Sequence, residues 1–416
     1  MPDQKNPQAT TKKVQGGMPS LRQLYRIGRG PSSSHTIGPE MICLATKDLF
    51  PTADSFRVVL YGSLAETGVG HGTDRVIKET FAPRKVELLF DTTTTDLPHP
   101  NTMDITPMQN GIPLETRRAC SIGGGDIRME GLSFPEEVVT YPVSSFAEIA
   151  SICKAEGKRL YEYVEECEGK DIWSYLSVVW DNMETAVRLG LSAEGILPGG
   201  LGVQRKAKQL ISSIDANEPA QIKEMRQVCA YAFAVSEQNA ASGRIVTAPT
   251  CGAAGVLPAV LYDYAKNKGK SREDILKALA TASIIGNLTK TNASVSGAEC
   301  GCQAEIGTAC SMAAAALAEL EGLSIDQIEY AAEIAFEHQL GLTCDPICGL
   351  VQIPCIERNA VAAMRAINAM GLARFLADTR KISLDLVIET MYKTGLDLSN
   401  KYRETAKGGL AELYTI

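Results

Sequence analysis

Residues 145–167, SFAEIASICKAEGKRLYEYVEEC, begin a helical pattern of apolar residues that decides the fold of the rest of the chain. Later segments continue this pattern and carry helix start signals. Ser271 with Asp274 matches a capping box, and a second capping box begins at Ser324. Signals for strands almost vanish over the same region. The sequence therefore predicts an all-helical domain over residues 145–416.

The preceding part of the chain has a different pattern, with short strand candidates separated by glycine-rich turns. FRVVLY (56–61) and KVELLF (85–90) are rich in β-branched and aromatic residues, and EEVVTY (136–141) is a further strand candidate. We therefore predict an α+β N-terminal domain over residues 19–144, followed by the all-α domain. Residues 1–18 are interrupted by prolines and glycines, and we expect them to form a disordered leader.

Composition and charge narrow the class of protein. The 416 residues are 45% hydrophobic and carry a formal charge of −8, without the basic stripe that nucleic-acid binding requires. The sequence contains no uninterrupted apolar run of the roughly 18 residues that a membrane-spanning helix needs, and no signal-peptide pattern. We therefore expect a cytoplasmic protein that binds neither nucleic acid nor a membrane.

The cysteines are concentrated in the second half of the chain. Seven of the twelve fall between residues 251 and 355, in the glycine-flanked segments TAPTCGAAG (247–255), SGAECGCQAE (296–305) and LTCDPICGLVQIPCIERN (342–359) and just after the second of them. Thiolates bind zinc and iron-sulfur clusters, but these spacings lack the paired CxxC motifs of compact zinc sites. Several buried thiols without a ligand remain an alternative explanation.

Two histidine motifs lie in the N-terminal domain. GRGPSSSHTIGPE (28–40) places His35 after three serines, and GVGHGTD (68–74) places His71 among glycines. Histidine transfers protons near neutral pH, and hydroxyls together with backbone amides bind carboxylates. A hydroxyl-rich turn or helix cap is the alternative for the first motif. In the second, Asp74 is either a helix cap or a residue that orients the histidine.

Long motifs occur in a fixed order along the chain: GPSSSHTIGP, YGSLAETGVGHGTD, SIGGG, EGILPGG, SGRIVTAPTCGAAG, TNASVSGAECGCQAEIGTACSMAAA, EHQLGLTCDP, PCIERNAVAAMRAINA and KYRETAKGGLA. Together they resemble the iron-sulfur-dependent L-serine dehydratases of the single-chain type, from about residue 20 to residue 411. The resemblance implies a β domain, an all-helical α domain and a 4Fe-4S cluster held by Cys302, Cys344 and Cys355. It also implies one open iron, which acts as a Lewis acid on the substrate hydroxyl.

The implied reaction converts L-serine to pyruvate and ammonia, as in amino-acid degradation and gluconeogenesis. It needs a base for the α-proton and groups that bind the carboxylate. We expect Ser33 and Ser34 to bind the carboxylate, His35 or His71 to transfer the proton, and Lys290 to be a further catalytic candidate. Further substrate contacts are expected from Thr250, Cys251, Asn292 and Ser294. The expected partners are an amino-acid substrate and a second copy of the chain in a homodimer.

The sequence departs from the family pattern at three thiols. The family usually has Asn at the position of Cys251, and usually lacks cysteines at the positions of Cys300 and Cys348. A thiol forms weaker hydrogen bonds than an amide, so L-threonine or L-cysteine are alternative substrates. Cys310, which enters an alanine-rich segment, is expected only to pack.

Two other functions compete with this prediction. A pyridoxal-phosphate dehydratase would use Lys290 for the Schiff base and SGAECG as a phosphate loop, although that loop would then carry thiols without a purpose. A cysteine-based redox or metal sensor is the alternative from another class. A sensor normally carries an output module, and the sequence shows no basic recognition helix.

Overall fold

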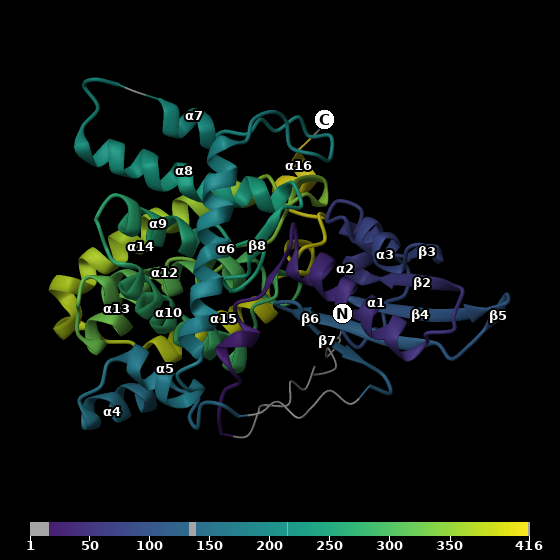
Figure 1. The fold of residues 1–416 in the computed structure, drawn as a ribbon, viewed down its shortest axis with the longest axis horizontal. Coiled ribbons are helices and arrows are strands. Elements are labelled where there is room, and N and C mark those ends of the chain that lie inside the picture. Colours follow the sequence, from purple (N-terminus) through teal and green to yellow (C-terminus); the bar gives the residue numbers. More distant parts are fainter. Residues whose placement is uncertain (1–15, 133–138, 214, 415–416) are drawn as a thin grey trace, which may run out of the picture.

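The computed structural model describes residues 16–132, 139–213 and 215–414. Two parts lie side by side in Figure 1: a sheet-containing N-terminal part and a larger helical part. The predicted leader therefore lies mostly outside the described residues. Its last residue, Met18, is fully buried and forms a β-bridge with Tyr141.

A mixed sheet forms the N-terminal part. Its strands run in the order β3-β2-β4-β6-β7, β5 pairs with β4, and only the β2–β3 pair is parallel. The strands are β2 (Ser55–Tyr61), β3 (Lys85–Asp91), β4 (Thr102–Gln109), β5 (Ile112–Pro113), β6 (Arg117–Gly123) and β7 (Asp126–Met129). β2 and β3 confirm the first two predicted strands. The first half of the third, 136–138, lies outside the described residues, and 139–141 form no strand beyond the bridge of Tyr141 to Met18.

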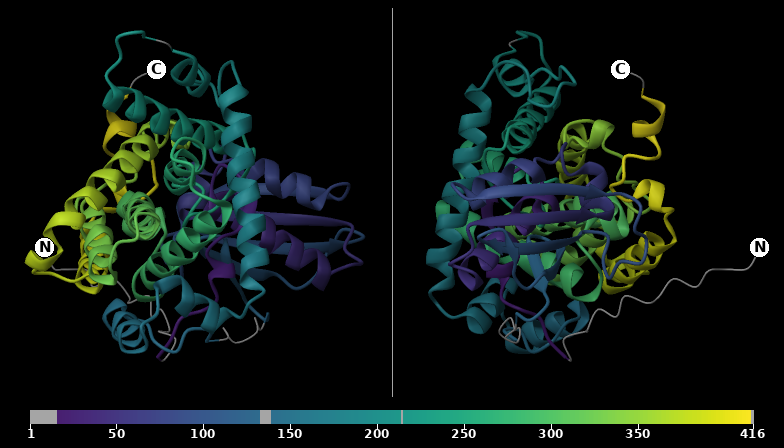
Figure 2. Two further views of the ribbon diagram at one scale, coloured as in Figure 1. Left: turned by 60° about the vertical axis from the view of Figure 1, so that its left-hand side comes forward. Right: turned by 90° about the vertical axis from the view of Figure 1, so that its right-hand side faces the viewer.

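Helices cover one face of this sheet. They are α1 (Gly38–Leu49), α2 (Gly62–Thr67) and α3 (Thr73–Phe81). Alternate residues of β2, namely Phe56, Val58 and Leu60, are buried with Ile42 of α1 and Phe81 of α3 in one core. The alternation that predicted a strand therefore also sets which face meets the helices. In the second view of Figure 2, this part faces the viewer in front of the helical part.

The helical part is built around α12, an alanine-rich helix that packs against α9, α10, α13 and α14. Its helices are α4 (Phe146–Glu156), α5 (Leu160–Glu168), α6 (Ile172–Ser192), α7 (Ala207–Ser212), α8 (Ala220–Ala240), α9 (Val256–Lys266), α10 (Arg272–Asn292), α11 (Gly297–Cys300), α12 (Thr308–Leu320), α13 (Ile325–Glu337), α14 (Cys355–Leu376), α15 (Leu384–Asp397) and α16 (Leu410–Leu413). Ser271 and Ser324 cap α10 and α13 through complete capping boxes. The predicted fold class is confirmed.

The start of the described chain belongs to the helical core, which the sequence did not predict. Leu21, Leu24 and Tyr25 are buried among the core helices. The following strand β1 (Ile27–Arg29) pairs antiparallel with β8 (Arg244–Val246), a strand within the predicted all-helical region. Leu21 and Leu24 are three residues apart and lie on one face of this segment, which the helical core buries. The two parts are thereby tied together beside the histidine motifs.

Among the described residues, one segment, Cys355–Thr379, is long and apolar enough to cross a membrane by length and composition alone. It contains α14, which packs against α8, α12 and α13 within the helical part. This packing is typical of a core helix in a helical domain.

Candidate active site

Three cysteines from two segments of the chain line one pocket at the junction of the two parts. Cys302 lies between α11 and the short helix η3 (Gln303–Gly307), Cys344 lies between α13 and α14, and Cys355 is the first residue of α14. The Cys344 N–H donates to the carbonyl of Tyr402 at 2.8 Å, and the Cys344 carbonyl accepts from the Glu404 N–H at 2.9 Å. Residues from both parts complete the wall: Pro31, Ser32, His71, Gly252, Glu305, Pro346, Val351 and Glu404.

The three sulfurs are not grouped closely enough to bind one tetrahedral metal ion together. In a tetrahedral zinc site, Zn–S bonds of about 2.3 Å bring the sulfurs within about 4 Å of one another. Among the described residues, the one set of three His, Cys, Asp or Glu ligand atoms that all lie within 4.8 Å contains none of these cysteines. The three thiols nevertheless face the same pocket. Iron-sulfur clusters are held by cysteine thiolates and fill the space between them with their own atoms, so the donor set is compatible with such a cluster.

Burial opposes ionisation of these thiols, so a thiolate here needs a compensating positive charge. Burial raises the pKa of Cys302 to about 11, although Arg358 acts in the opposite direction, and it raises the pKa of Cys344 well above its usual value. Arg358 donates to the Thr343 carbonyl at 2.6 Å and to Asp345 Oδ1 at 3.0 Å, which fixes its charge beside the cysteines. A bound metal deprotonates coordinating thiols outright. The donor set therefore suits a metal centre.

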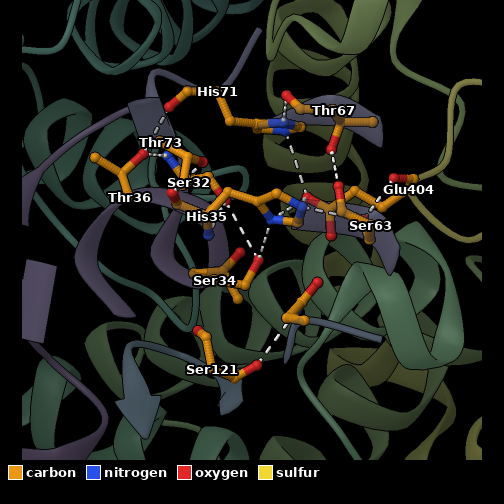
Figure 3. A network of polar contacts seen from close by, with 12 residues as sticks. Ser32, Ser34, His35, Thr36, Ser63, Thr67, His71, Thr73, Ser121 and Glu404 are labelled. Atoms are coloured by element: carbon orange, nitrogen blue, oxygen red, sulfur yellow. Dashed lines mark hydrogen bonds and ion pairs between the residues drawn. The ribbon is translucent and has the colours of Figure 1, made fainter. Parts of the chain in front are cut away.

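His35 and His71 lie against each other on the N-terminal side of the pocket (Figure 3). Both are buried, and their ring centroids are 4.4 Å apart. His35 is held at both ring nitrogens, with Nδ1 2.9 Å from Ser34 Oγ and Nε2 3.0 Å from Ser63 Oγ. His71 Nδ1 lies 2.9 Å from the carbonyl oxygen of Thr67. Hydrogen bonds and the stacking of the two rings thus fix both side chains in position.

The contact to Thr67 decides which nitrogen of His71 is free. A carbonyl oxygen only accepts hydrogen bonds, so Nδ1 donates and Nε2 keeps its lone pair. Burial lowers the pKa of His71 to about 4, which keeps the ring neutral near pH 7. Of the two histidines, His71 lines the pocket. His71 Nε2 is therefore the better-placed proton acceptor. His35 does not line the pocket and stacks against the ring of His71.

Glu404 connects the histidines to the cysteine loops. Its Oε1 lies 3.6 Å from His35 Nδ1 and 3.4 Å from His71 Nε2. Its backbone has a φ of 59°, a left-handed conformation that costs energy for a residue with a side chain. Burial, and next the charge of Glu305, raise the pKa of Glu404 well above its usual value, while the Ala298 amide acts in the opposite direction.

Glu305 is a second buried carboxyl group in the pocket. Its Oε1 accepts a hydrogen bond from the Thr250 hydroxyl at 2.7 Å. Burial raises the pKa of Glu305 to about 7, partly offset by this hydrogen bond. A Cβ on Gly297 would lie 2.6 Å from Glu305 Oε2 and 3.2 Å from Cys344 Sγ, so only glycine leaves room for both groups.

Comparison with known proteins identifies the family. Residues 20–80 match the serine dehydratase beta chain, and residues 112–411 match the serine dehydratase alpha chain. The chain belongs to the serine dehydratase family. It is 41% identical to proteins named L-serine dehydratase from Streptomyces coelicolor (94% of this chain, 98% of the relative) and Haemophilus influenzae (95% and 99%). It is also 41% identical to L-serine dehydratase 1 of Escherichia coli (95% and 99%). The resemblance read from the sequence is confirmed.

In this member of the serine dehydratase family, two predicted site residues lie outside the pocket wall. Lys290 Nζ is 2.5 Å from Asp126 Oδ2 and donates to the Gln23 carbonyl at 3.0 Å, so its charge joins the two parts. The Asn292 side-chain amide donates to the carbonyl of Ser144 at 2.7 Å. Both side chains are occupied by structural contacts. Because Lys290 is an ion-pair partner outside the pocket, the structure does not support its use for a Schiff base.

The other predicted substrate contacts are buried close to the pocket without forming its wall. Ser33 and Ser34 are buried, but their neighbour Ser32 lines the pocket. Thr250 meets the pocket only through its hydrogen bond to Glu305. Cys251 is packed in the helical core, and the Ser294 hydroxyl accepts from the Ser296 N–H at 3.1 Å. The serine motif thus reaches the pocket one residue earlier than predicted.

The additional thiols of this family member lie away from the pocket wall. Cys300 is fully buried, and a Cβ on Gly395 of α15 would lie 2.8 Å from its sulfur, so the two elements are in close contact. The Cys310 thiol donates to the Ala362 carbonyl at 3.2 Å inside the core, in agreement with its predicted packing role. Cys348 is exposed, in the loop between Cys344 and Cys355.

Sequence reasoning missed the acidic and basic residues of the site. Glu305 and Arg358 lie three residues after Cys302 and Cys355, and Glu404 lies in KYRETAKGGLA. All three were inside motifs that carried the family resemblance. The usable signal was a charged residue embedded in a glycine-rich or apolar segment, where burial requires a partner.

The two buried histidines predict a loss of stability in acid. An unfolded histidine takes up a proton near pH 6.5, whereas folded His71 resists protonation down to about pH 4. Unfolding therefore becomes more favourable as the pH falls through this window, by about 3 kcal/mol for His71. The melting temperature at pH 5 relative to pH 7 measures the effect, and His71→Gln should reduce the difference. His338→Gln, at an exposed position, is the matched control; an equal reduction there would contradict the assignment.

Proposed function

We propose that this chain is an iron-sulfur-dependent L-serine ammonia-lyase, which converts L-serine to pyruvate and ammonia. One observation carries the proposal: Cys302, Cys344 and Cys355 line a single pocket together with His71 and Glu404. The family and the names of the relatives supply the substrate, since the chain is 41% identical to L-serine dehydratases along nearly its whole length.

The three cysteines would hold a four-iron cluster in this pocket. When bound, a cluster with only three protein ligands supplies an iron with an open coordination position, a Lewis acid toward the 3-hydroxyl of serine. Arg358 fits such a centre because it offsets part of the negative charge of three thiolates. Cys251 is not among the residues that line the pocket, which favours L-serine over the alternative substrates L-threonine and L-cysteine.

The protein's own groups handle the α-proton. The Nε2 of His71 is unprotonated and lines the pocket, so it accepts the proton from the α-carbon. His35 and Glu404 support the imidazolium that forms, His35 by stacking and Glu404 by its nearby carboxylate. Loss of the α-proton and the 3-hydroxyl gives an enamine, which tautomerises to an imine and is hydrolysed to pyruvate and ammonia. Ser32 lines the pocket, and we assign it and the adjacent amides to the substrate carboxylate.

Anaerobic reconstitution tests the proposal. The purified chain is loaded with iron and sulfide and assayed for 2-oxo-acid release from L-serine, L-threonine, L-cysteine and their D-isomers. We expect a brown, air-sensitive protein that acts on L-serine in preference to the others. A yellow sample that borohydride bleaches would favour the pyridoxal alternative, and iron binding without turnover of any of these amino acids would favour the sensor.

We further propose that the protein acts as a cytoplasmic homodimer. Light scattering on the reconstituted protein at several concentrations measures its mass against the 44.6 kDa of one chain. A mass of one chain at all concentrations would contradict the dimer.

A further inference from the structure

The pocket holds two buried acidic side chains, and no lysine or arginine of the described chain lines it beside them. Among the described residues that line it, Glu305 and Glu404 are acidic and none is lysine or arginine. Arg358, beside the cysteines, is bound to the Thr343 carbonyl and to Asp345. A buried carboxylate is strongly disfavoured unless it meets a cation or several hydrogen-bond donors. The pocket is therefore built to receive a positively charged group.

The two carboxyl groups differ in how many of their oxygens already have a polar partner. Glu305 Oε1 accepts from the Thr250 hydroxyl at 2.7 Å. Glu404 Oε1 faces the two histidines, whereas Glu404 Oε2 is buried without a hydrogen-bond partner among the described residues. The side chain of Glu404 is only 7% exposed, and the residue as a whole is 5% exposed. An unpaired buried oxygen is uncommon in folded proteins and is typical of a functional position or of a site that a bound group completes.

Glu404 is also held rigidly by both parts of the protein. Its N–H donates to the Cys344 carbonyl at 2.9 Å, and its carbonyl accepts from the Ser63 hydroxyl at 2.8 Å (Figure 3). These bonds maintain the left-handed backbone conformation at this residue. A binding group fixed from two sides costs little ordering when the ligand arrives.

We propose that Glu404 Oε2 binds the α-ammonium group of the amino-acid substrate. This assignment rests on the proposed function, because it takes the substrate to be an α-amino acid. The ammonium group is attached to the carbon that loses its proton. Glu404 Oε1 lies 3.4 Å from His71 Nε2, so an ammonium group on the other oxygen brings the α-carbon next to the base. Glu404 thereby selects α-amino acids over acids that lack nitrogen.

Binding of unreactive ligands to the reconstituted protein tests this assignment. L-Alanine keeps the ammonium and carboxylate groups but has no hydroxyl to lose, and propanoate also lacks the ammonium group. Calorimetry should show L-alanine binding at least about 10-fold more tightly than propanoate. In Glu404→Gln the two ligands should bind with about equal affinity, because L-alanine binds more weakly while the affinity for propanoate is nearly unchanged. Visible absorbance checks that the variant keeps its cluster.

Two controls make the outcomes distinct. Glu412→Gln removes an exposed carboxylate from the same C-terminal segment and should keep the full preference. Glu305→Gln should keep most of the preference for L-alanine. The assignment would be overturned if Glu305→Gln lost this preference while Glu404→Gln kept it. Propanoate binding as tightly as L-alanine in the unmodified protein would overturn it without any variant. If L-serine is still converted in that case, the proposed function stands and only the ammonium site fails.

Discussion

Replacing Cys344 with serine should remove the cluster and abolish turnover of L-serine. A hydroxyl is a hard, protonated group that does not replace a thiolate on iron. The backbone of Cys344 is bonded to Tyr402 and Glu404, so the rest of the pocket should keep its shape after this change. We expect iron and sulfide content after reconstitution to fall to a small fraction of that of the unmodified protein, with activity below detection.

The same loop supplies the control for this experiment. Cys348 is exposed and four residues from Cys344, and it does not line the pocket. Cys348→Ser should therefore keep its iron content, visible absorbance and activity. Full iron content in Cys344→Ser, or equal losses in both variants, would contradict the assignment of Cys344 as a ligand.

Replacing His71 with alanine should lower kcat by about 10²- to 10⁴-fold while the cluster remains bound. His71 lines the pocket with an unprotonated Nε2, and no cysteine ligand depends on its side chain for a hydrogen bond. A base that acts only in the reaction contributes mainly to kcat, so the effect on KM should be much smaller. Visible absorbance and iron content measure the cluster separately from turnover.

His35 provides a comparison within the same pair. It is hydrogen-bonded at both nitrogens and lies behind His71, so His35→Gln should lower kcat less than His71→Ala. The reverse order would make His35 the base. Normal turnover in His71→Ala would remove His71 from the reaction.

Local signals explain how much of the fold was predictable. The capping boxes at Ser271 and Ser324 and the strands near 56–61 and 85–90 depend on residues a few positions apart, and the structure confirms them. The β1–β8 pair joins residues 27–29 with residues 244–246. No local pattern encodes that pairing, because it forms only when the helical core closes over the first described residues.

The candidate site also has features that the sequence predicts and features that depend on the tertiary structure. The sequence by itself determined the family, the three cysteine ligand candidates and the presence of histidines beside serines, because these are properties of residue type and order. Only the tertiary structure decided that Glu404 meets His35 and His71, more than 300 residues earlier in the chain, and that Lys290 pairs with Asp126 away from the pocket. The physical reason is burial: a charged side chain inside a protein takes whichever partner the packing of two distant segments brings to it, and that partner is set by the whole fold.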